Sequence, residues 1–165
     1  MSDLTTTRLR LHAFTAQEGR RILDVAPEEG DRWAADFPMQ DDRDGVGGFV
    51  KAAEAGLDPG PFGCYRIDDP DGVAVGTIGF YGPPDDDGQV TIGYGLVPDA
   101  RGSGYATEAV GGFVELCRSH PEVRAILADT DTDNLASQRV LEKNGFVFVR
   151  EDAELFYYRL DVTGA

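Results

Sequence analysis

Residues 98–108 hold the glycines and side chains whose types and spacing could bind a charged ligand. Pro98 cannot donate a ladder hydrogen bond, so a preceding strand ends there. Gly102 and Gly104 allow a tight turn and a close approach of the backbone to a ligand. A helix that follows directs its unpaired N–H groups and its positive dipole end into this turn. With Arg101 beside them, these features favour a phosphate or pyrophosphate site over a merely tight connection.

Two common nucleotide-binding motifs fit this segment poorly. A dinucleotide fingerprint requires a third glycine, and Thr107 stands in its place. That fingerprint should also open a doubly wound parallel sheet, whereas an antiparallel meander is expected before this loop. A Walker A loop requires G-K-[ST], which is absent. A dinucleotide-dependent enzyme therefore remains only as an alternative, and it predicts saturable NAD binding.

The sequence around the loop predicts the elements that must position it. Strands are expected where β-branched and aromatic residues cluster, at 8–14, 63–68, 74–81, 90–97, 123–129, 146–150 and 155–162. Helices are expected at about 16–25, 47–55, 104–119 and 135–144. Turn-forming runs make the first half antiparallel, and the third helix connects two strands as a βαβ unit. The predicted fold is mixed α/β (α+β) over a single domain, 1–165, with a central, mostly antiparallel sheet of about seven strands, one βαβ crossover and about four helices.

Length, composition and charge exclude several classes of protein. A chain of 165 residues that is 41% hydrophobic can build one core without a disulfide or metal staple. Its net charge of -15 repels phosphate backbones, so nucleic-acid binding is not expected. The surface either attracts protonated amines or only keeps the protein in solution, and charge alone favours the second.

The chain is also expected to be cytoplasmic and free of membrane contacts. No apolar run approaches a membrane span, and the N-terminus lacks the pattern of a secretory signal. Cys64 and Cys117 have no metal-ligand spacing and are interpreted as small buried hydrophobes in a reduced compartment. The acidic run 129–133 invites a calcium hypothesis but lacks the glycine and glutamate of an EF-hand loop, so no metal is expected.

The ordered set of motifs resembles the GNAT superfamily of N-acetyltransferases. That family's acetyl-CoA signature is Q/R-x-x-G-x-G/A at the junction of its fourth strand and third helix, and Arg101–Ala106 match it in full. Further segments are similar to the RimJ/RimL-type branch of ribosomal-protein N-terminal acetyltransferases: Arg8–Leu11, Ile92–Tyr94, Gly104–Ala109, and Asn134 and Ser137 together with Glu142–Phe146. The resemblance covers roughly 8–160. It implies acetyl transfer from acetyl-CoA to a primary amine, by direct attack in a ternary complex, and a homodimer, which is common in this family.

The resemblance also implies a cofactor site along the loop. The pyrophosphate would lie on the backbone amides of Arg101, Gly102, Ser103, Gly104, Tyr105, Ala106 and Thr107. The main chain of Leu96 and Val97 would pair with the pantetheine arm, in a gap between two splayed strands. A bulge at Gly93 and Gly95 would open that gap, unless these glycines serve packing alone.

On the next helix, the resemblance places Asn134 on the pantetheine and Ser137 near the thioester sulfur. Asn134 is also a good N-cap, whose side chain could simply bond the amide of Ser137. Arg139 and Lys143 either approach the CoA phosphates or are solvated helix charges.

Catalytic residues are only partly identified. Leu141 replaces the tyrosine acid of many GNAT enzymes, and Thr91 replaces the glutamate that often precedes Ile-Gly-Tyr. Ser137 is therefore the candidate catalytic residue, and the base is left open. Glu108 fits the family pattern, but its place in the first turn of a helix favours a role at the helix dipole. These vacancies keep a non-catalytic acyl-CoA-binding sensor as the alternative function.

Trp33, Phe37 and Tyr94 are the expected acceptor-site residues. The first two lie among aspartates where the substrate loop of this family is usually found. An aromatic and acidic pocket would suit an ammonium group. A hydrophobic plug with a polar rim explains the two aromatic residues of this loop equally well.

Overall fold

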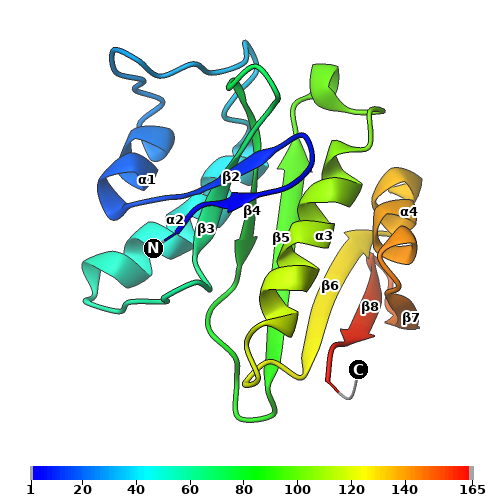
Figure 1. Ribbon diagram of the computed structural model, residues 1–165. Coiled ribbons are helices and arrows are strands. Elements are labelled where there is room, and N and C mark those ends of the chain that lie inside the picture. The colour runs from blue at the N-terminus through cyan, green and yellow to red at the C-terminus, as the bar shows by residue number, and fades with distance from the viewer. Residues whose placement is uncertain (1, 164–165) are drawn as a thin grey trace.

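A computed structural model describes residues 2–163 as one eight-stranded sheet with helices on both faces (Figure 1). The strands are β1 (Leu4–Thr5), β2 (Arg10–Ala13), β3 (Cys64–Asp68), β4 (Ala74–Phe80), β5 (Gln89–Leu96), β6 (Ala125–Asp131), β7 (Val147–Glu151) and β8 (Leu155–Asp161). Their order is β1-β2-β3-β4-β5-β6-β8-β7, and among these eight described strands only β5 and β6 pair in parallel. The predicted mixed, mostly antiparallel sheet is confirmed. The strand count rises from about seven to eight because the two-residue β1 is too short to show a pattern.

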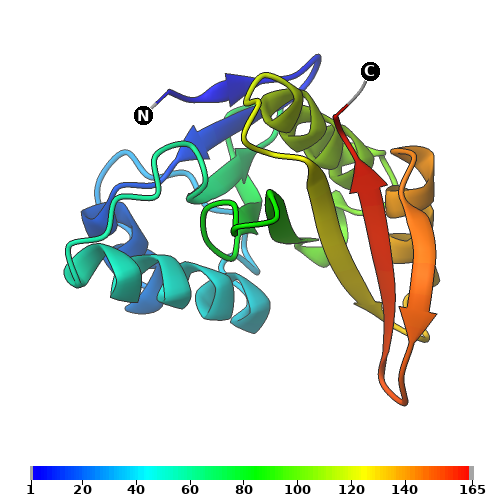
Figure 2. The same cartoon turned by 90° about the horizontal axis from the view of Figure 1, so that it is seen from below.

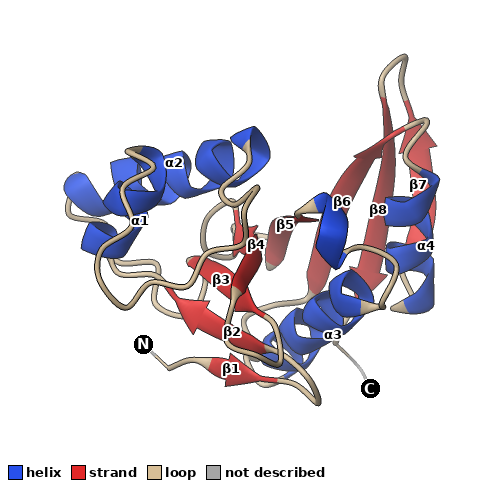
Figure 3. Ribbon diagram, turned by 90° about the horizontal axis from the view of Figure 1, so that it is seen from above, coloured by secondary structure: helices blue, strands red, loops and turns tan. Residues whose placement is uncertain are grey.

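Four α-helices accompany the sheet, as the sequence predicts. They are α1 (Ala16–Leu23), α2 (Gln40–Glu54), α3 (Tyr105–Arg118) and α4 (Leu135–Lys143), and a short 3-10 turn, η1 (Pro98–Ala100), precedes α3. Figures 2 and 3 show α1 and α2 on one face of the sheet and α3 with α4 on the other. The apolar stripe of α3, with Phe113 and Val110 fully buried, packs on the core of the sheet. Within residues 2–163, no helix is long and apolar enough to cross a bilayer.

The start of α2 corrects the sequence prediction, which places this helix at 47–55. The helix begins at Gln40, and the carboxylate of Asp42 accepts a hydrogen bond from the backbone amide of Met39 at 2.8 Å. Three glycines within the first ten residues of α2 lower its intrinsic helix propensity and hide its beginning. Burial of Val46 and Val50 against α1 offsets this weakness, because tertiary packing supplies most of the stability of such a helix.

The parallel ladder between β5 and β6 is short, and this opens the sheet. Its last pair is Thr91 with Leu127, after which the two strands diverge (Figure 1). The expected bulge is wrong, since the β4–β5 register runs unbroken past Gly93 and Gly95. A Cβ at Gly93 would meet the end of the exposed Tyr81 side chain, which can move aside, so this contact does not require glycine either. The splay therefore comes from the end of the ladder and not from an extra residue in β5.

Candidate active site

The loop between β5 and α3 presents an uncapped helix N-terminus. Gly102 and Gly104 have φ angles of +85° and +84°, which only glycine adopts without strain. Gly104 is the N-cap of α3, and no side chain bonds to the first amides of that helix. Free N–H groups and the positive end of the helix dipole therefore meet at one point. This geometry suits a phosphate or pyrophosphate group.

A groove of about 490 Å³ runs from this loop along β5 to the start of α4. It is lined by the predicted cofactor residues Leu96, Arg101, Gly102, Gly104, Tyr105, Ala106, Thr107, Asn134 and Ser137. Val97 and Ser103 do not line it. Three basic side chains, Arg101, Arg139 and Lys143, border the groove, which favours a ligand with several negative charges.

One edge of β5 is open to a ligand along this groove. The Tyr81 amide donates to the carbonyl of Thr91 at 2.9 Å, and the Val97 amide donates to Val75 at 2.8 Å, so odd-numbered residues of β5 face β4. Successive residues of a strand point their polar backbone groups to opposite sides. The amides of Tyr94 and Leu96 therefore face the gap beyond the end of the β5–β6 ladder.

The hydrogen bonds of Val97 do not fit the main-chain pairing with a pantetheine arm that the resemblance implies for this residue. Its amide is bonded to Val75, and its carbonyl accepts the amide of Ala100 at 3.0 Å. Neither group is free to pair with a pantetheine arm. The carbonyl of Leu96 accepts a hydrogen bond from Nε of Arg101 at 3.0 Å, so Leu96 offers its amide alone. Arg101 thereby ties the end of β5 to the loop that follows it.

The N-terminal segment holds the loop from outside the groove. The carboxylate of Glu108 accepts hydrogen bonds from the amide of Arg8 at 2.7 Å, from Nε of Arg8 at 2.8 Å and from the hydroxyl of Thr6. Arg8 also donates to the carbonyl of Ser103 at 2.8 Å, and its guanidinium lies 4.7 Å from the ring centre of Tyr105. Glu108 thus does more than interact with the helix dipole. Sequence reasoning missed this link, although both partners lie in segments that carry the family resemblance.

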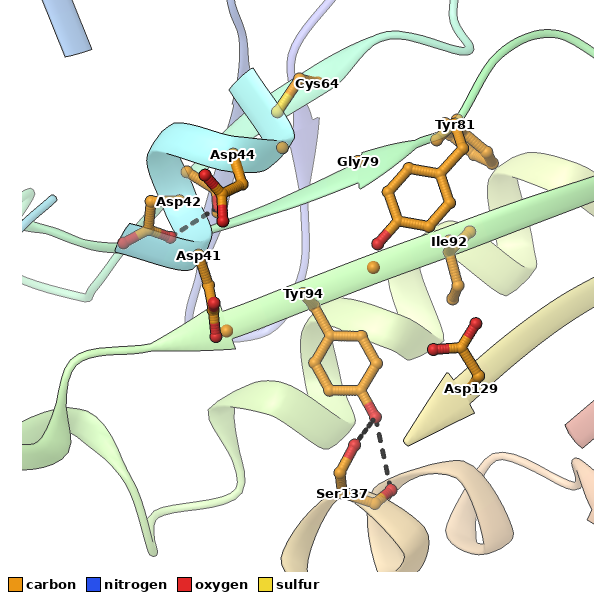
Figure 4. Close-up of a pocket in the computed structure, with 15 residues that line it drawn as sticks. Asp41, Asp42, Asp44, Cys64, Gly79, Tyr81, Ile92, Tyr94, Asp129 and Ser137 are labelled. Carbon is orange, nitrogen blue, oxygen red and sulfur yellow. Dashed lines mark hydrogen bonds between the residues drawn. The ribbon is translucent and has the colours of Figure 1, made fainter. Parts of the chain in front are cut away.

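A second cavity, of about 370 Å³, lies on the α2 side of the gap. Its charged lining is acidic only: Asp41, Asp42, Asp44 and Asp129. It shares Asp41, Tyr94, Gly95 and Ser137 with the groove, so the two spaces meet at these residues. Figure 4 shows Asp41, Tyr94 and Ser137 at the cavity. One space is basic and the other acidic, and β5 runs between them.

Tyr94 and Ser137 are hydrogen-bonded at this meeting point. Their hydroxyl oxygens are 2.8 Å apart, and the Tyr94 hydroxyl also lies 3.3 Å from the carbonyl of Ser137 (Figure 4). Burial raises the pKa of Tyr94 to about 12, so its hydroxyl stays protonated near neutral pH. Asn134 caps α4 by accepting the Ser137 amide at 3.1 Å, and it also lines the groove. The capping role expected for Asn134 is therefore present, and its place in the groove is compatible with the second role.

The aromatic acceptor loop does not line either cavity. Phe37 is buried in the core, and the Trp33 ring packs edge-on against it with 5.5 Å between ring centres. Both residues form the hydrophobic plug that was the alternative explanation. The acidic cavity is lined instead by the first turn of α2, which lies outside the helix predicted from the sequence. Among residues 2–163, no group of three or more His, Cys, Asp or Glu side chains is arranged to hold a metal ion.

Comparisons with known proteins agree with this geometry. The acetyltransferase (GNAT) domain family matches residues 8–147. A Bacillus subtilis (strain 168) protein, described as an uncharacterized N-acetyltransferase, YjdG, is 30% identical over 160 residues, which cover 92% of this chain and 93% of that protein.

Solved structures share the fold at lower identity. RimL, a ribosomal L7/L12 alpha-N-protein acetyltransferase in complex with coenzyme A, has a TM-score of 0.72 and 16% identity, covering 99% of this chain and 100% of its own. A ribosomal-protein-S5-alanine acetyltransferase from Vibrio fischeri has a TM-score of 0.69 and 14% identity, covering 99% and 98%. On the domain match and the Bacillus relative, the chain belongs to the GNAT acetyltransferases, and its structural neighbours include the RimL-type enzymes.

Proposed function

We propose that this protein transfers an acetyl group from acetyl-CoA to a primary amine within a ternary complex. The observation that carries the proposal is the meeting of a basic groove and an acidic cavity at Tyr94, Gly95 and Ser137. A thioester lying at this point would be reached from opposite sides by its carrier and by its acceptor. Holding both reactants in one site lowers the entropic part of the barrier.

The groove residues fit the parts of a CoA molecule in order. The uncapped amides of α3 would hold the pyrophosphate, with Arg139 and Lys143 on α4 as neighbouring positive charges. The open edge of β5, at Tyr94 and Leu96, would pair with the amides of the pantetheine arm. Acetyl-CoA would supply the activated acetyl group, and everything else in the reaction would depend on the residues around the junction.

At the junction, the protein would bind and orient the reacting groups. The backbone amide of Tyr94 or Leu96 would donate to the carbonyl oxygen, which becomes negative as the amine attacks. The hydroxyl pair of Ser137 and Tyr94 would donate a hydrogen bond to the departing sulfur. The acidic cavity would attract the acceptor as an ammonium ion. A primary amine is therefore favoured over a neutral hydroxyl acceptor.

A thermal-shift titration tests the cofactor half of this proposal. A ligand at 100 times its dissociation constant stabilises a fold by about 2.7 kcal/mol, which raises Tm by several degrees. We expect this shift with acetyl-CoA and with CoA, and none with NAD. A shift with NAD alone would support a dinucleotide-dependent protein and contradict the proposal.

An amine screen tests the catalytic half. Release of CoA thiol is followed with a panel of free-N-terminus peptides, Nα-acetyl-lysine, spermidine and kanamycin, at saturating acetyl-CoA. We expect saturable turnover with at least one of these amines. If the folded protein binds CoA but turns over no member of the panel, the acyl-CoA-binding sensor is favoured instead.

A further inference from the structure

We infer that Asp129 is the proton acceptor for the amine in this reaction. The inference rests on the proposed function and names the base that sequence analysis leaves open. Three independent features of Asp129 support the assignment: its position on β6, its freedom from other partners, and the charges around it.

The position follows from the end of the β5–β6 ladder. The last paired residue of β6 is Leu127, and Asp129 comes two residues later, where the strands have separated. Because side chains alternate along a strand, Leu127, Asp129 and Asp131 lie on one face. Figure 4 shows the Asp129 carboxylate pointing into the acidic cavity that Tyr94 and Tyr81 also line. A group there is on the acceptor side of the junction.

The other carboxylates of the cavity are less suited to this task. Asp42 is only 3% exposed and is committed to the hydroxyl of Thr77, at 2.6 Å, and to the Met39 amide. Asp44 accepts a hydrogen bond from Nε2 of Gln40 at 2.8 Å. Asp41 lies in the first turn of α2, where the helix dipole stabilises the ionised carboxylate. Asp41 is therefore better suited to attracting a cation than to accepting a proton. Within residues 2–163, the Asp129 side chain has no hydrogen-bond or ion-pair partner, so its lone pairs are free.

The charges around Asp129 strengthen it as a base. Asp129 is exposed on average, but its partial burial at the cavity raises its pKa, and the negative charges of Asp131 and Asp152 raise the pKa further. From β8, Tyr157 stands opposite Asp129 in the ladder, and the titratable side chains of Tyr81, Tyr94 and Asp41 line the same cavity. On the neighbouring β7, the Arg150 guanidinium lies 3.7 Å from the ring centre of Tyr157, and within residues 2–163 it forms no ion pair with Asp129. A raised pKa narrows the gap to that of an ammonium ion, which favours proton transfer.

The proposed step conserves protons and electron pairs. The acceptor arrives as an ammonium ion, and one N–H bond breaks as the Asp129 carboxylate takes the proton. The nitrogen lone pair forms a C–N bond to the thioester carbon, and the C=O π pair moves to oxygen. That pair then returns and the C–S bond breaks, while the excess proton on nitrogen passes to the departing sulfur. Asp129 releases its proton to water, so the net products are an amide, CoA thiol and one proton.

The test compares variants in their pH profiles with the panel amine that gives the highest rate, at saturating acetyl-CoA. We expect Asp129→Asn to lower kcat by about 100-fold or more at pH 7, the usual size of a general-base contribution. The acidic limb of the wild-type profile, which reports the titration of Asp129, should disappear. The rate of the variant should instead rise with pH up to the pKa of the amine itself. Asp129→Glu should recover at least tenfold of the lost rate. The KM for acetyl-CoA should stay unchanged in both variants.

Two further variants separate a base from a charge effect. Asp131→Asn removes one negative charge from beside Asp129, so the acidic limb should move to lower pH while the maximal rate is kept. Asp41→Asn should raise the KM for the amine and leave the acidic limb in place. If Asp129→Asn retains its acidic limb, or keeps kcat within threefold of the wild type, the assignment of Asp129 is wrong.

A titration without turnover keeps this inference separate from the proposed function. Carboxyl ¹³C resonances of labelled aspartate are followed against pH in the CoA-bound protein, and Asp129→Asn identifies the resonance of interest. We expect this carboxyl to titrate above the ordinary aspartate value of 3.8. A pKa at or below that value would overturn the base assignment by itself. A panel without turnover would instead overturn the proposed function.

Discussion

The hydroxyl groups of Ser137 and Tyr94 come from different elements and share one hydrogen bond at the junction of the two cavities. Sequence analysis places Ser137 near the thioester and Tyr94 at the acceptor site. The structure adds the bond between them and the burial that keeps the Tyr94 hydroxyl protonated. As a pair, they can donate to sulfur without either group having to ionise first.

Removal of either hydroxyl should therefore reduce the chemical step. We expect Ser137→Ala and Tyr94→Phe each to lower kcat by about 100-fold, the lower end of the range for the loss of one donor to a developing charge. The double variant should be little worse than the single variants, because the two groups act as one unit. Steady-state kinetics with the best panel amine measures both effects. Ser119→Ala, at the exposed end of α3, is the matched control, and additive losses would contradict the paired role.

At the scale of elements, the site depends on how the loop before α3 is held. The backbone angles of Gly102 and Gly104 shape the loop, and the segment between β1 and β2 fastens it through Arg8 and Glu108. Burial of the Glu108 carboxyl opposes ionisation, but hydrogen bonds from Thr6 and Arg8 outweigh it and lower the pKa of this group. The carboxylate therefore remains charged and bonded across the neutral pH range.

Loss of this link should weaken CoA binding while the fold stays intact. We expect Glu108→Gln or Arg8→Ala to raise the Kd of CoA by about fivefold, since partly exposed charged hydrogen bonds contribute about 1 kcal/mol. Isothermal titration gives the Kd values, and the double variant should show strong non-additivity. Glu115→Gln, on the exposed face of the same helix, should bind CoA as the wild type does. Equal Kd values in all four proteins would show that the link has no role in cofactor binding.

The whole molecule carries a net charge of -15, yet its charges are sorted around the site. The basic residues Arg101, Arg139 and Lys143 border the groove beside α3 and α4, and the charged residues of the second cavity are all aspartates. The excess of negative charge elsewhere repels itself and works against the compact state. Salt screens such repulsion over distances of about 10 Å at 0.1 M.

Added salt should therefore stabilise this protein. We expect Tm to rise by about 2 to 4 °C between 10 mM and 500 mM NaCl at pH 7, which corresponds to roughly 1 kcal/mol for a domain of this size. Scanning calorimetry measures the shift, and KCl should give the same value as NaCl if screening is the cause. A fall in Tm would mean that attractive ion pairs outweigh the overall repulsion.

Patterns among near neighbours in the sequence were sufficient to predict much of the fold and the glycine-containing loop before α3. Alternation and helical periodicity located seven strands and the cores of the four helices, and α1 begins at a Thr15–Glu18 capping box of near neighbours in the sequence. The start of α2 was missed because its glycines weaken the local signal, and tertiary packing against α1 decides the helix. The bulge expected at Gly93 and Gly95 was wrong because a glycine inside a strand indicates a bulge only weakly, and the β4–β5 register is regular at both residues.

By itself, the sequence determined the glycine turn, the uncapped start of α3 and the family resemblance, because backbone angles, caps and motif spacing depend on near neighbours. Only the tertiary structure decided that Trp33 and Phe37 belong to the core, that Glu108 bonds Arg8 one hundred residues away, and that the Val97 amide is already paired. It also brought Asp129 on β6 and Asp41 on α2 into one cavity. The physical reason is that long-range neighbours follow from how strands pair and where their ladders end, which no short stretch of residues encodes.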